Sequence, residues 1–115
     1  MRRQVRKERF RIMSEIKITK DNFEAEVLKA EQPVLLDFWA AWCGSCRMLS
    51  PVLTQLAEKQ GGRVKIGRVN IDEEPALAER FRVKSIPLLA VLQNGKIVRR
   101  AVGYMPLEEL EALLA

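Results

Sequence analysis

Cys43 and Cys46 are the only cysteines of the chain, and two residues separate them in the segment FWAAWCGSCRML. They follow an apolar run, residues 34–39, that predicts a buried strand, and they precede apolar residues at helical spacing. Two thiols at this spacing can be half of a zinc site, a short structural disulfide, or a reactive dithiol that exchanges electrons with other proteins.

The first two alternatives are poorly supported by the rest of the chain. A zinc site normally needs four ligands, and the sequence has no histidine and no third cysteine, so metal binding would need a second chain. A disulfide that closes so short a loop removes little entropy from the unfolded chain. A chain of 115 residues, 48% of them hydrophobic, can also bury a core without such a bridge.

The predicted position of Cys43 favours redox chemistry. At a helix N-terminus, free backbone N–H groups and the positive end of the helix dipole stabilise a thiolate, which is the nucleophile of disulfide exchange. Cys43 would attack a disulfide of the partner, and Cys46, one turn further on, would attack Cys43 and release the reduced partner. Gly44 would let the backbone turn tightly beside the incoming protein.

Asp37 is the single acidic residue inside the apolar run before the cysteines. A buried carboxylate is costly when charged, so we expect its pKa to rise toward neutrality. Such a group is a poised proton acceptor. The alternative is a buried aspartate that serves only hydrogen bonds.

The elements that must position these residues alternate along the chain. Strand-like patterns occupy residues 16–18, 34–39, 64–71, 88–92 and 97–102, and helix-like patterns occupy 23–28, 48–57, 72–81 and 107–114. The resulting order, βαβαβαββα, predicts an α/β domain with a partly parallel sheet.

Several residues mark the expected boundaries of these elements. Asp21 or Asn22 can cap the first helix, and Gly61 with Gly62 can end the second. Pro51 lies within the second helix, where we expect a kink rather than a break because the apolar pattern continues past it. Asn94 and Gly95 predict a type I′ hairpin between the last two strands.

The charge of the chain is concentrated at its start. The net charge is +5, and residues 1–12 alone carry six Arg or Lys against one Glu. We therefore expect a basic extension over residues 1–13, either disordered or not native, with a polyanion-binding or membrane-surface arm as the alternative. Residues 14–115 form the predicted domain, whose balanced charge argues against nucleic-acid binding. Since no run of about 18 apolar residues occurs, no membrane span is predicted.

The segment FWAAWCGSCRMLSPVL is similar to the active-site segment of thioredoxins. Further stretches agree in the same order, namely VNIDEEP, SIPL before the Asn-Gly hairpin, and Val102-Gly103, so that the resemblance covers residues 15–115. It implies the thioredoxin fold, an α/β architecture with a central mixed five-stranded sheet flanked by helices on both faces. It also implies a protein-disulfide reductase.

The resemblance assigns expected roles to individual residues. Cys43 would be the nucleophile, Cys46 the resolving thiol, and Asp37 the general base that acts on Cys46. The groove that binds the partner's extended chain, with Pro87 as a cis-proline, would be formed by Trp42, Gly44, Ser45, Ile86, Pro87 and Gly103.

Three positions depart from the usual family pattern. Ser45 replaces a proline and adds a hydrogen-bond donor close to Cys43, which leaves the reduction potential open. Arg68 replaces a lysine near Asp37 and would modulate that carboxyl without releasing a proton itself. Leu88 replaces a common threonine after Pro87 and would make the groove more apolar.

The resemblance further implies a monomer that works in the reducing cytoplasm with no bound cofactor or metal. NADPH would supply electrons through a thioredoxin reductase, and disulfide-containing client proteins would receive them. Two alternatives share these residues, a disulfide oxidant or isomerase and a non-catalytic binding module.

Overall fold

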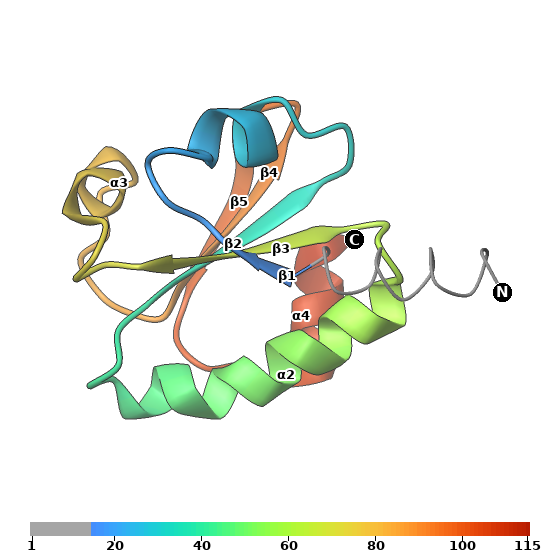
Figure 1. The fold of residues 1–115 in the computed structure, drawn as a ribbon. Helices are drawn as coiled ribbons and strands as arrows, with labels where there is room; N and C mark the ends of the chain where they lie inside the picture. Colours follow the sequence, from blue (N-terminus) through green and yellow to red (C-terminus); the bar gives the residue numbers. More distant parts are fainter. Residues whose placement is uncertain (1–14) are drawn as a thin grey trace, which may run out of the picture.

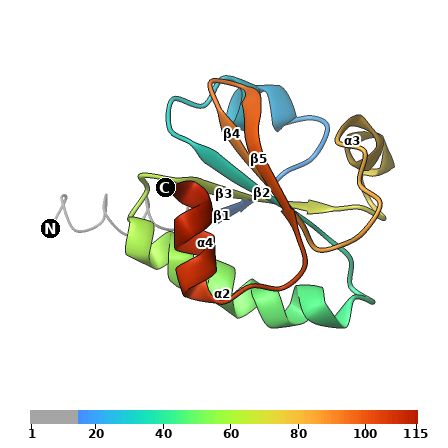
Figure 2. The same ribbon diagram turned by 180° about the vertical axis from the view of Figure 1, so that it is seen from behind.

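The computed structural model describes residues 15–115, so the predicted basic extension lies outside the described residues. The elements follow the predicted order, with strands β1 (Glu15–Lys17), β2 (Val34–Trp39), β3 (Lys65–Asn70), β4 (Leu88–Gln93) and β5 (Lys96–Val102), and helices η1 (Glu24–Leu28), α2 (Gly44–Gln60), α3 (Pro75–Arg80) and α4 (Leu107–Leu114). Figure 1 shows their arrangement, and Figure 2 shows the same molecule from behind.

The five strands form one mixed sheet in the order β1-β3-β2-β4-β5. The pairs β1/β3 and β2/β3 are parallel, and the pairs β2/β4 and β4/β5 are antiparallel. The expected mixed five-stranded sheet is therefore confirmed. Strand β2 lies at its centre, and the loop that carries the cysteines leaves from the end of this strand.

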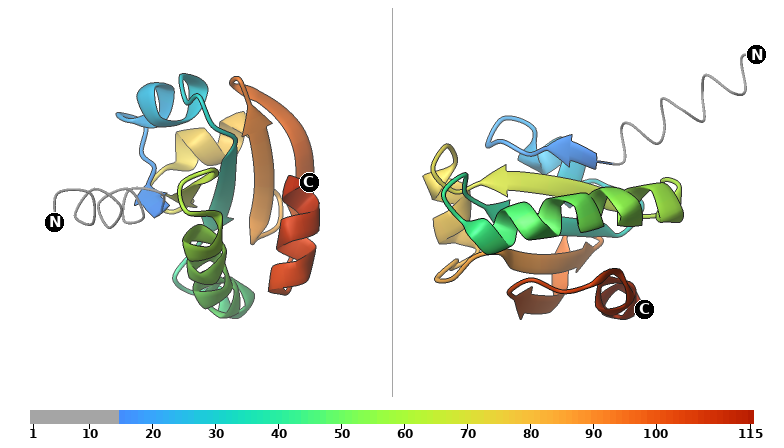
Figure 3. Two further views of the ribbon diagram at one scale, coloured as in Figure 1. Left: turned by 90° about the vertical axis from the view of Figure 1, so that its right-hand side faces the viewer. Right: turned by 90° about the horizontal axis from the view of Figure 1, so that it is seen from below.

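Helices cover both faces of the sheet, as expected. Helices η1 and α3 lie on one face, and α2 and α4 lie on the other (Figures 1 and 3). We call the apolar cluster under the first pair the η1–α3 core; it contains Ile18, Phe23, Val27, Val34, Leu36, Phe38, Val69, Leu77, Phe81, Leu88, Ala90 and Leu92. The α2–α4 core contains Leu35, Leu49, Leu53, Leu56, Ala57, Val64, Ile66, Leu89, Val91, Met105 and Leu110.

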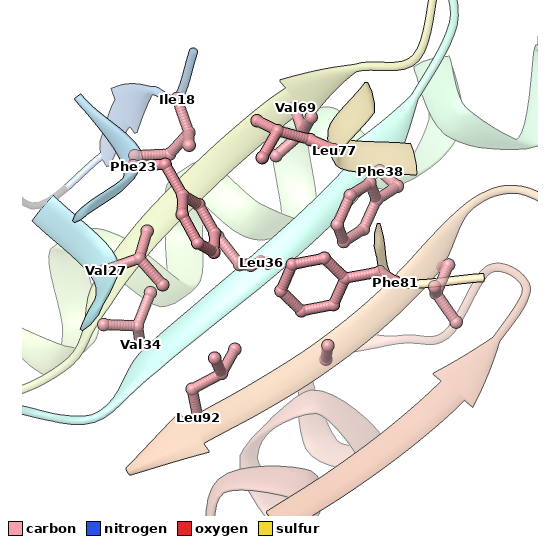
Figure 4. Packing of buried hydrophobic residues seen from close by; sticks show 12 residues of the cluster. Ile18, Phe23, Val27, Val34, Leu36, Phe38, Val69, Leu77, Phe81 and Leu92 are labelled. Carbon is pink, nitrogen blue, oxygen red and sulfur yellow. The ribbon is translucent and has the colours of Figure 1, made fainter. Parts of the chain in front are cut away.

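Three aromatic rings form the centre of the η1–α3 core (Figure 4). The ring of Phe81 lies edge-on to that of Phe23, with centroids 5.8 Å apart, and is tilted against that of Phe38 at 4.9 Å. Aromatic pairs at these distances add to the stabilisation from apolar burial.

Alternation along β2 sends neighbouring side chains to opposite faces. Leu36 and Phe38 belong to the η1–α3 core, while Leu35 belongs to the α2–α4 core. Asp37 lies two residues after Leu35 and so points to the same face of the sheet, toward helix α2.

The prediction that Asp21 or Asn22 caps the first helix is wrong. Helix η1 begins at Glu24 with Phe23 at its N-cap and no capping side-chain hydrogen bond. The Asn22 side chain instead closes the turn before the helix, because its Oδ1 accepts from the Thr19 N–H at 2.8 Å.

Gly61, Asn94 and Gly95 act as expected, and Pro51 does not break its helix. Helix α2 runs unbroken through Pro51 and ends at Gly61, whose φ of 57° is left-handed. Asn94 and Gly95 have φ of 53° and 76°, the positive values that a type I′ turn requires. Between residues 15 and 115, no helix has the length and apolar character needed to cross a membrane.

Candidate active site

Cys43 and Cys46 are joined by a disulfide at the start of helix α2, with their Cα atoms 5.3 Å apart. Cys43 is the N-cap residue, and its Sγ accepts a hydrogen bond from the Cys46 N–H at 3.2 Å. The predicted location at a helix N-terminus is thereby confirmed. Cys43 keeps 7% of its surface exposed and Cys46 only 1%, so Cys43 is the more accessible residue of the pair.

The Ser45 hydroxyl lies 3.4 Å from Cys43 Sγ. Because a sulfur in a disulfide carries no proton, the hydroxyl is the donor in this state. This places the added donor that the sequence suggested beside the expected nucleophile.

The peptide bond between Ile86 and Pro87 is cis, as the resemblance implied. Ile86 packs against the two cysteines, and its carbonyl oxygen lies 3.9 Å from Cys43 Sγ. The Gly103 N–H donates to the Pro87 carbonyl at 2.8 Å, which brings the end of β5 to the same place. Residues far apart in the sequence therefore meet at the disulfide.

The two glycines expected in the groove differ in what their backbone requires. Gly103 has a φ of 103°, which other residues rarely adopt, so its conformation alone favours glycine. At Gly44, a Cβ would come no closer than 3.9 Å to an Arg47 nitrogen, so the fold itself would accept a larger residue. The expected role of Gly44, to leave space for a partner, remains a prediction.

The two tryptophans of the active-site segment have different environments. Trp42 is 67% exposed, which excludes core packing for it, and its Nε1 donates to Asp72 Oδ2 at 3.0 Å. Trp39 is half-buried and packs against the cysteines. An exposed aromatic surface beside the disulfide is suited to contact with another protein.

Asp37 is fully buried, and its ion-pair partner among residues 15–115 is Arg68, whose Nε lies 3.4 Å from Asp37 Oδ2. Burial raises the pKa of the Asp37 carboxyl to about 6, although the charge and hydrogen bond of Arg68 lower it, and the Glu15 charge raises it slightly further. The expected rise is confirmed. A carboxyl with this pKa changes protonation close to neutral pH.

Two contacts in this region were not foreseen from the sequence. Arg68 Nη1 donates to the Ser50 hydroxyl at 2.8 Å, and Asp72 fixes the Trp42 indole. A serine in an amphipathic helix gives no signal of its partner. The pairing of Arg68 with Asp37 was expected from the resemblance, and the parallel register sets the two residues opposite each other.

The fold and the disulfide together define a protein of the dithiol–disulfide exchange class. The family model described as "Thioredoxin" matches residues 14–115. A thioredoxin of Streptomyces clavuligerus is 51% identical over 89 residues, which are 77% of this chain and 82% of the relative. A thioredoxin of Alicyclobacillus acidocaldarius is 44% identical over 98 residues, 85% of this chain and 92% of the relative.

The chain therefore belongs to the thioredoxin family. It is a thiol–disulfide oxidoreductase that reduces protein disulfides through the Cys43–Cys46 pair, and neither the oxidant or isomerase nor the binding module is favoured. Proteins of this family need no bound cofactor. Among residues 15–115, no three His, Cys, Asp or Glu side chains gather as a metal site would require.

Proposed function

We propose that Cys43 is the attacking thiol, Cys46 the resolving thiol and Asp37 the proton acceptor in the reduction of client disulfides. The observation that carries this assignment is the order of burial at one helix N-terminus, where Cys43, which is 7% exposed, precedes Cys46, which is 1% exposed. A thiolate at the outer position meets the client, and the inner thiol can reach only its neighbour.

The reaction transfers two electrons to the client. The Cys43 thiolate attacks one client sulfur, the client disulfide breaks, and the other client sulfur leaves as a thiolate. Cys46 then gives its proton to Asp37, and its thiolate attacks Cys43 Sγ. The bond between Cys43 and the client breaks, which releases the second client thiolate and leaves the Cys43–Cys46 disulfide.

The groove for the client consists of the exposed Trp42 indole, the Gly44–Ser45 turn, Ile86 with Pro87, and Gly103. The contact of Ile86 with Cys43, and the hydrogen bond from the Gly103 N–H to the Pro87 carbonyl, support this assignment. Arg68 modulates the Asp37 carboxyl through its charge and its hydrogen bond.

The oxidised protein needs a source of two electrons for the next cycle. We assign this role to a thioredoxin reductase that uses NADPH, with disulfide-containing proteins as clients. The protein would work as a monomer in the cytoplasm, where a reducing environment keeps the dithiol form available.

The equilibrium reduction potential of the Cys43–Cys46 pair tests the direction of the reaction. We expect about −270 mV, the thioredoxin range, when the full chain is equilibrated in a thiol–disulfide buffer. A value near about −180 mV or above would assign the protein to oxidation or isomerisation instead.

Trapping distinguishes the roles of the two cysteines. The Cys46→Ser variant should accumulate a mixed disulfide with a disulfide-linked peptide, because no resolving thiol remains. The Cys43→Ser variant, its matched control, should accumulate none. Equal trapping by both variants would contradict the assignment.

A further inference from the structure

Ser50 lies in helix α2, four residues after Cys46, so the two side chains share one side of the helix. Its Oγ accepts a hydrogen bond from Arg68 Nη1 at 2.8 Å. The same guanidinium reaches the buried Asp37, so Ser50 is connected through one side chain to the carboxyl that the proposed function makes the proton acceptor.

Three groups fix the position of the Arg68 guanidinium. Besides the bond to Ser50, its Nε donates to Asp37 Oδ2 at 3.4 Å, and its Cζ lies 5.2 Å from the centroid of the Trp39 ring. The bond to Ser50 is the shorter of the two hydrogen bonds. An ion-paired N–H···O contact is usually about 2.7–2.9 Å long, so the contact with Asp37 is stretched.

The atoms used in these bonds show how the guanidinium is turned. A guanidinium binds a carboxylate most strongly through two parallel N–H groups, and the fork that contains Nε is completed by Nη2. Nη1, which binds Ser50, lies on the other side of the group. The hydrogen bond to Ser50 therefore pulls the guanidinium away from a two-point contact with Asp37.

The two oxygens of the Asp37 carboxyl consequently differ in their contacts. Asp37 Oδ2 has the single contact with Arg68, and Asp37 Oδ1 has no hydrogen-bond partner among the residues that the structure describes. An unpaired, buried carboxylate oxygen is unusual and is the atom at which a proton can be accepted.

We propose that Ser50 is a positioning residue, which together with Trp39 holds the Arg68 guanidinium to a one-point contact with Asp37 and so leaves Oδ1 open to the Cys46 proton. This inference rests on the proposed role of Asp37 as proton acceptor. A two-point contact, with Nε and Nη2 of Arg68 on the two oxygens of Asp37, would stabilise the charged carboxylate. The carboxylate would then be a weaker base.

Within the part of the chain that the structure describes, two charged groups shift the pKa of Asp37. Strand β3 contributes Arg68 and strand β1 contributes Glu15. The residue that β4 sets opposite Asp37 is the apolar Leu89. A change in the position of Arg68 should therefore dominate any change in the titration of Asp37.

The Ser50→Ala variant tests the proposal in the oxidised full-length chain. Without the hydroxyl, Nε and Nη2 of Arg68 can both bind the Asp37 carboxylate. We therefore expect the pKa of the carboxyl to fall by about one pH unit, as measured by carbon NMR titration. Ser50→Thr, which keeps the hydroxyl, should titrate as the unchanged protein. Amide spectra and thermal unfolding establish that each variant is folded.

The pKa of Asp37 could also rise in the Ser50→Ala variant, if the guanidinium moved away from the carboxyl. An open cavity beside Arg68, lined in part by Glu15, Asn70 and Glu73, offers the guanidinium a route toward solvent. If Ser50→Ala raised the pKa of Asp37 or left it unchanged, Ser50 would not be preventing the two-point contact between Arg68 and Asp37. The proposal would then be overturned.

A double-mutant cycle shows whether Ser50 acts through Arg68. In an Arg68→Met background, Ser50→Ala should leave the Asp37 titration unchanged. A shift of equal size in both backgrounds would overturn the proposal.

The kinetics separate this inference from the function on which it rests. In the reduced protein, Ser50→Ala should move the acid limb of the pH–rate profile for peptide disulfide reduction to lower pH, by the amount that NMR gives. If Asp37→Asn left the profile unchanged, Asp37 would not be the base. The NMR result for Ser50 would still decide whether that residue positions Arg68.

Discussion

The η1–α3 core and the α2 side of the sheet share the central strand β2, yet the buried polar side chain of the described residues, Asp37, lies on the α2 side. Leu36 and Phe38 turn to the η1–α3 core and meet apolar side chains there. Asp37, between them, turns to α2 and meets Arg68 and, through it, Ser50. One strand can therefore stabilise the fold on one face and hold an energetically unfavourable carboxyl on the other.

Phe81→Ala should produce the largest change in the free energy of unfolding. Phe81 is 4% exposed and packs against two other rings, so its loss should destabilise the protein by about 3–5 kcal/mol. Urea unfolding measures the loss. The reduction potential should stay the same, because the dithiol lies elsewhere; a large change in potential would mean that the two faces are coupled.

Asp37→Asn should increase the free energy of unfolding, whereas Phe81→Ala decreases it. The pKa of the carboxyl is about 6 in the folded protein against 3.8 as the ordinary value, so the folded state binds more protons between these pH values. Stability therefore falls as pH rises from about 4 to 6, and the charged carboxyl costs about 3 kcal/mol above that range.

The asparagine variant removes this cost, so it should be more stable by up to about 3 kcal/mol at pH 8 and no more stable at pH 3.5. Urea unfolding of both oxidised proteins across this range measures the difference. Parallel stability curves would show that Asp37 is not the group responsible.

Gly67→Ala should have the smallest of the three effects, and it acts on the apolar face. A Cβ at this position in β3 would lie 2.7 Å from Ile18 Cγ1 and 2.8 Å from Leu36 Cδ2. The overpacking should destabilise the protein by about 1–3 kcal/mol. An unchanged free energy of unfolding would mean that the η1–α3 core can rearrange at this point.

The order of elements could be predicted because each has a strong local pattern. The apolar run of β2, the Asn94-Gly95 turn and the leucine spacing of α4 need no knowledge of distant contacts. Helix η1 was placed correctly but its cap was not. Asn22 hydrogen-bonds the backbone of the preceding turn, as such side chains often do, and a local pattern cannot choose between these partners.

The residues of the site could be predicted where their type alone indicates a function. Contacts that depend on how distant elements pack together could not be predicted. Cys43, Cys46 and Asp37 stand out in the sequence because thiols at this spacing and a carboxyl in an apolar strand are rare. The contact between Ser50 and Arg68 joins residues 18 positions apart on different elements. Gly67 was also missed, because the need for a small residue arises only when Ile18 and Leu36 close over it.

The hydrogen bond from Gly103 to Pro87 has a consequence for how long a client stays bound. Proline offers no N–H, and the carbonyl of Pro87 is already engaged, whereas the N–H and C=O of Ile86 have no backbone partner within residues 15–115. Under the proposed function, Ile86 would therefore supply the backbone hydrogen bonds to a client. Such bonds contribute about 1 kcal/mol each, too little to hold a protein for long. The covalent bond between sulfurs would then set the lifetime of the encounter, and clients would be chosen by the reactivity of their disulfides more than by their sequence.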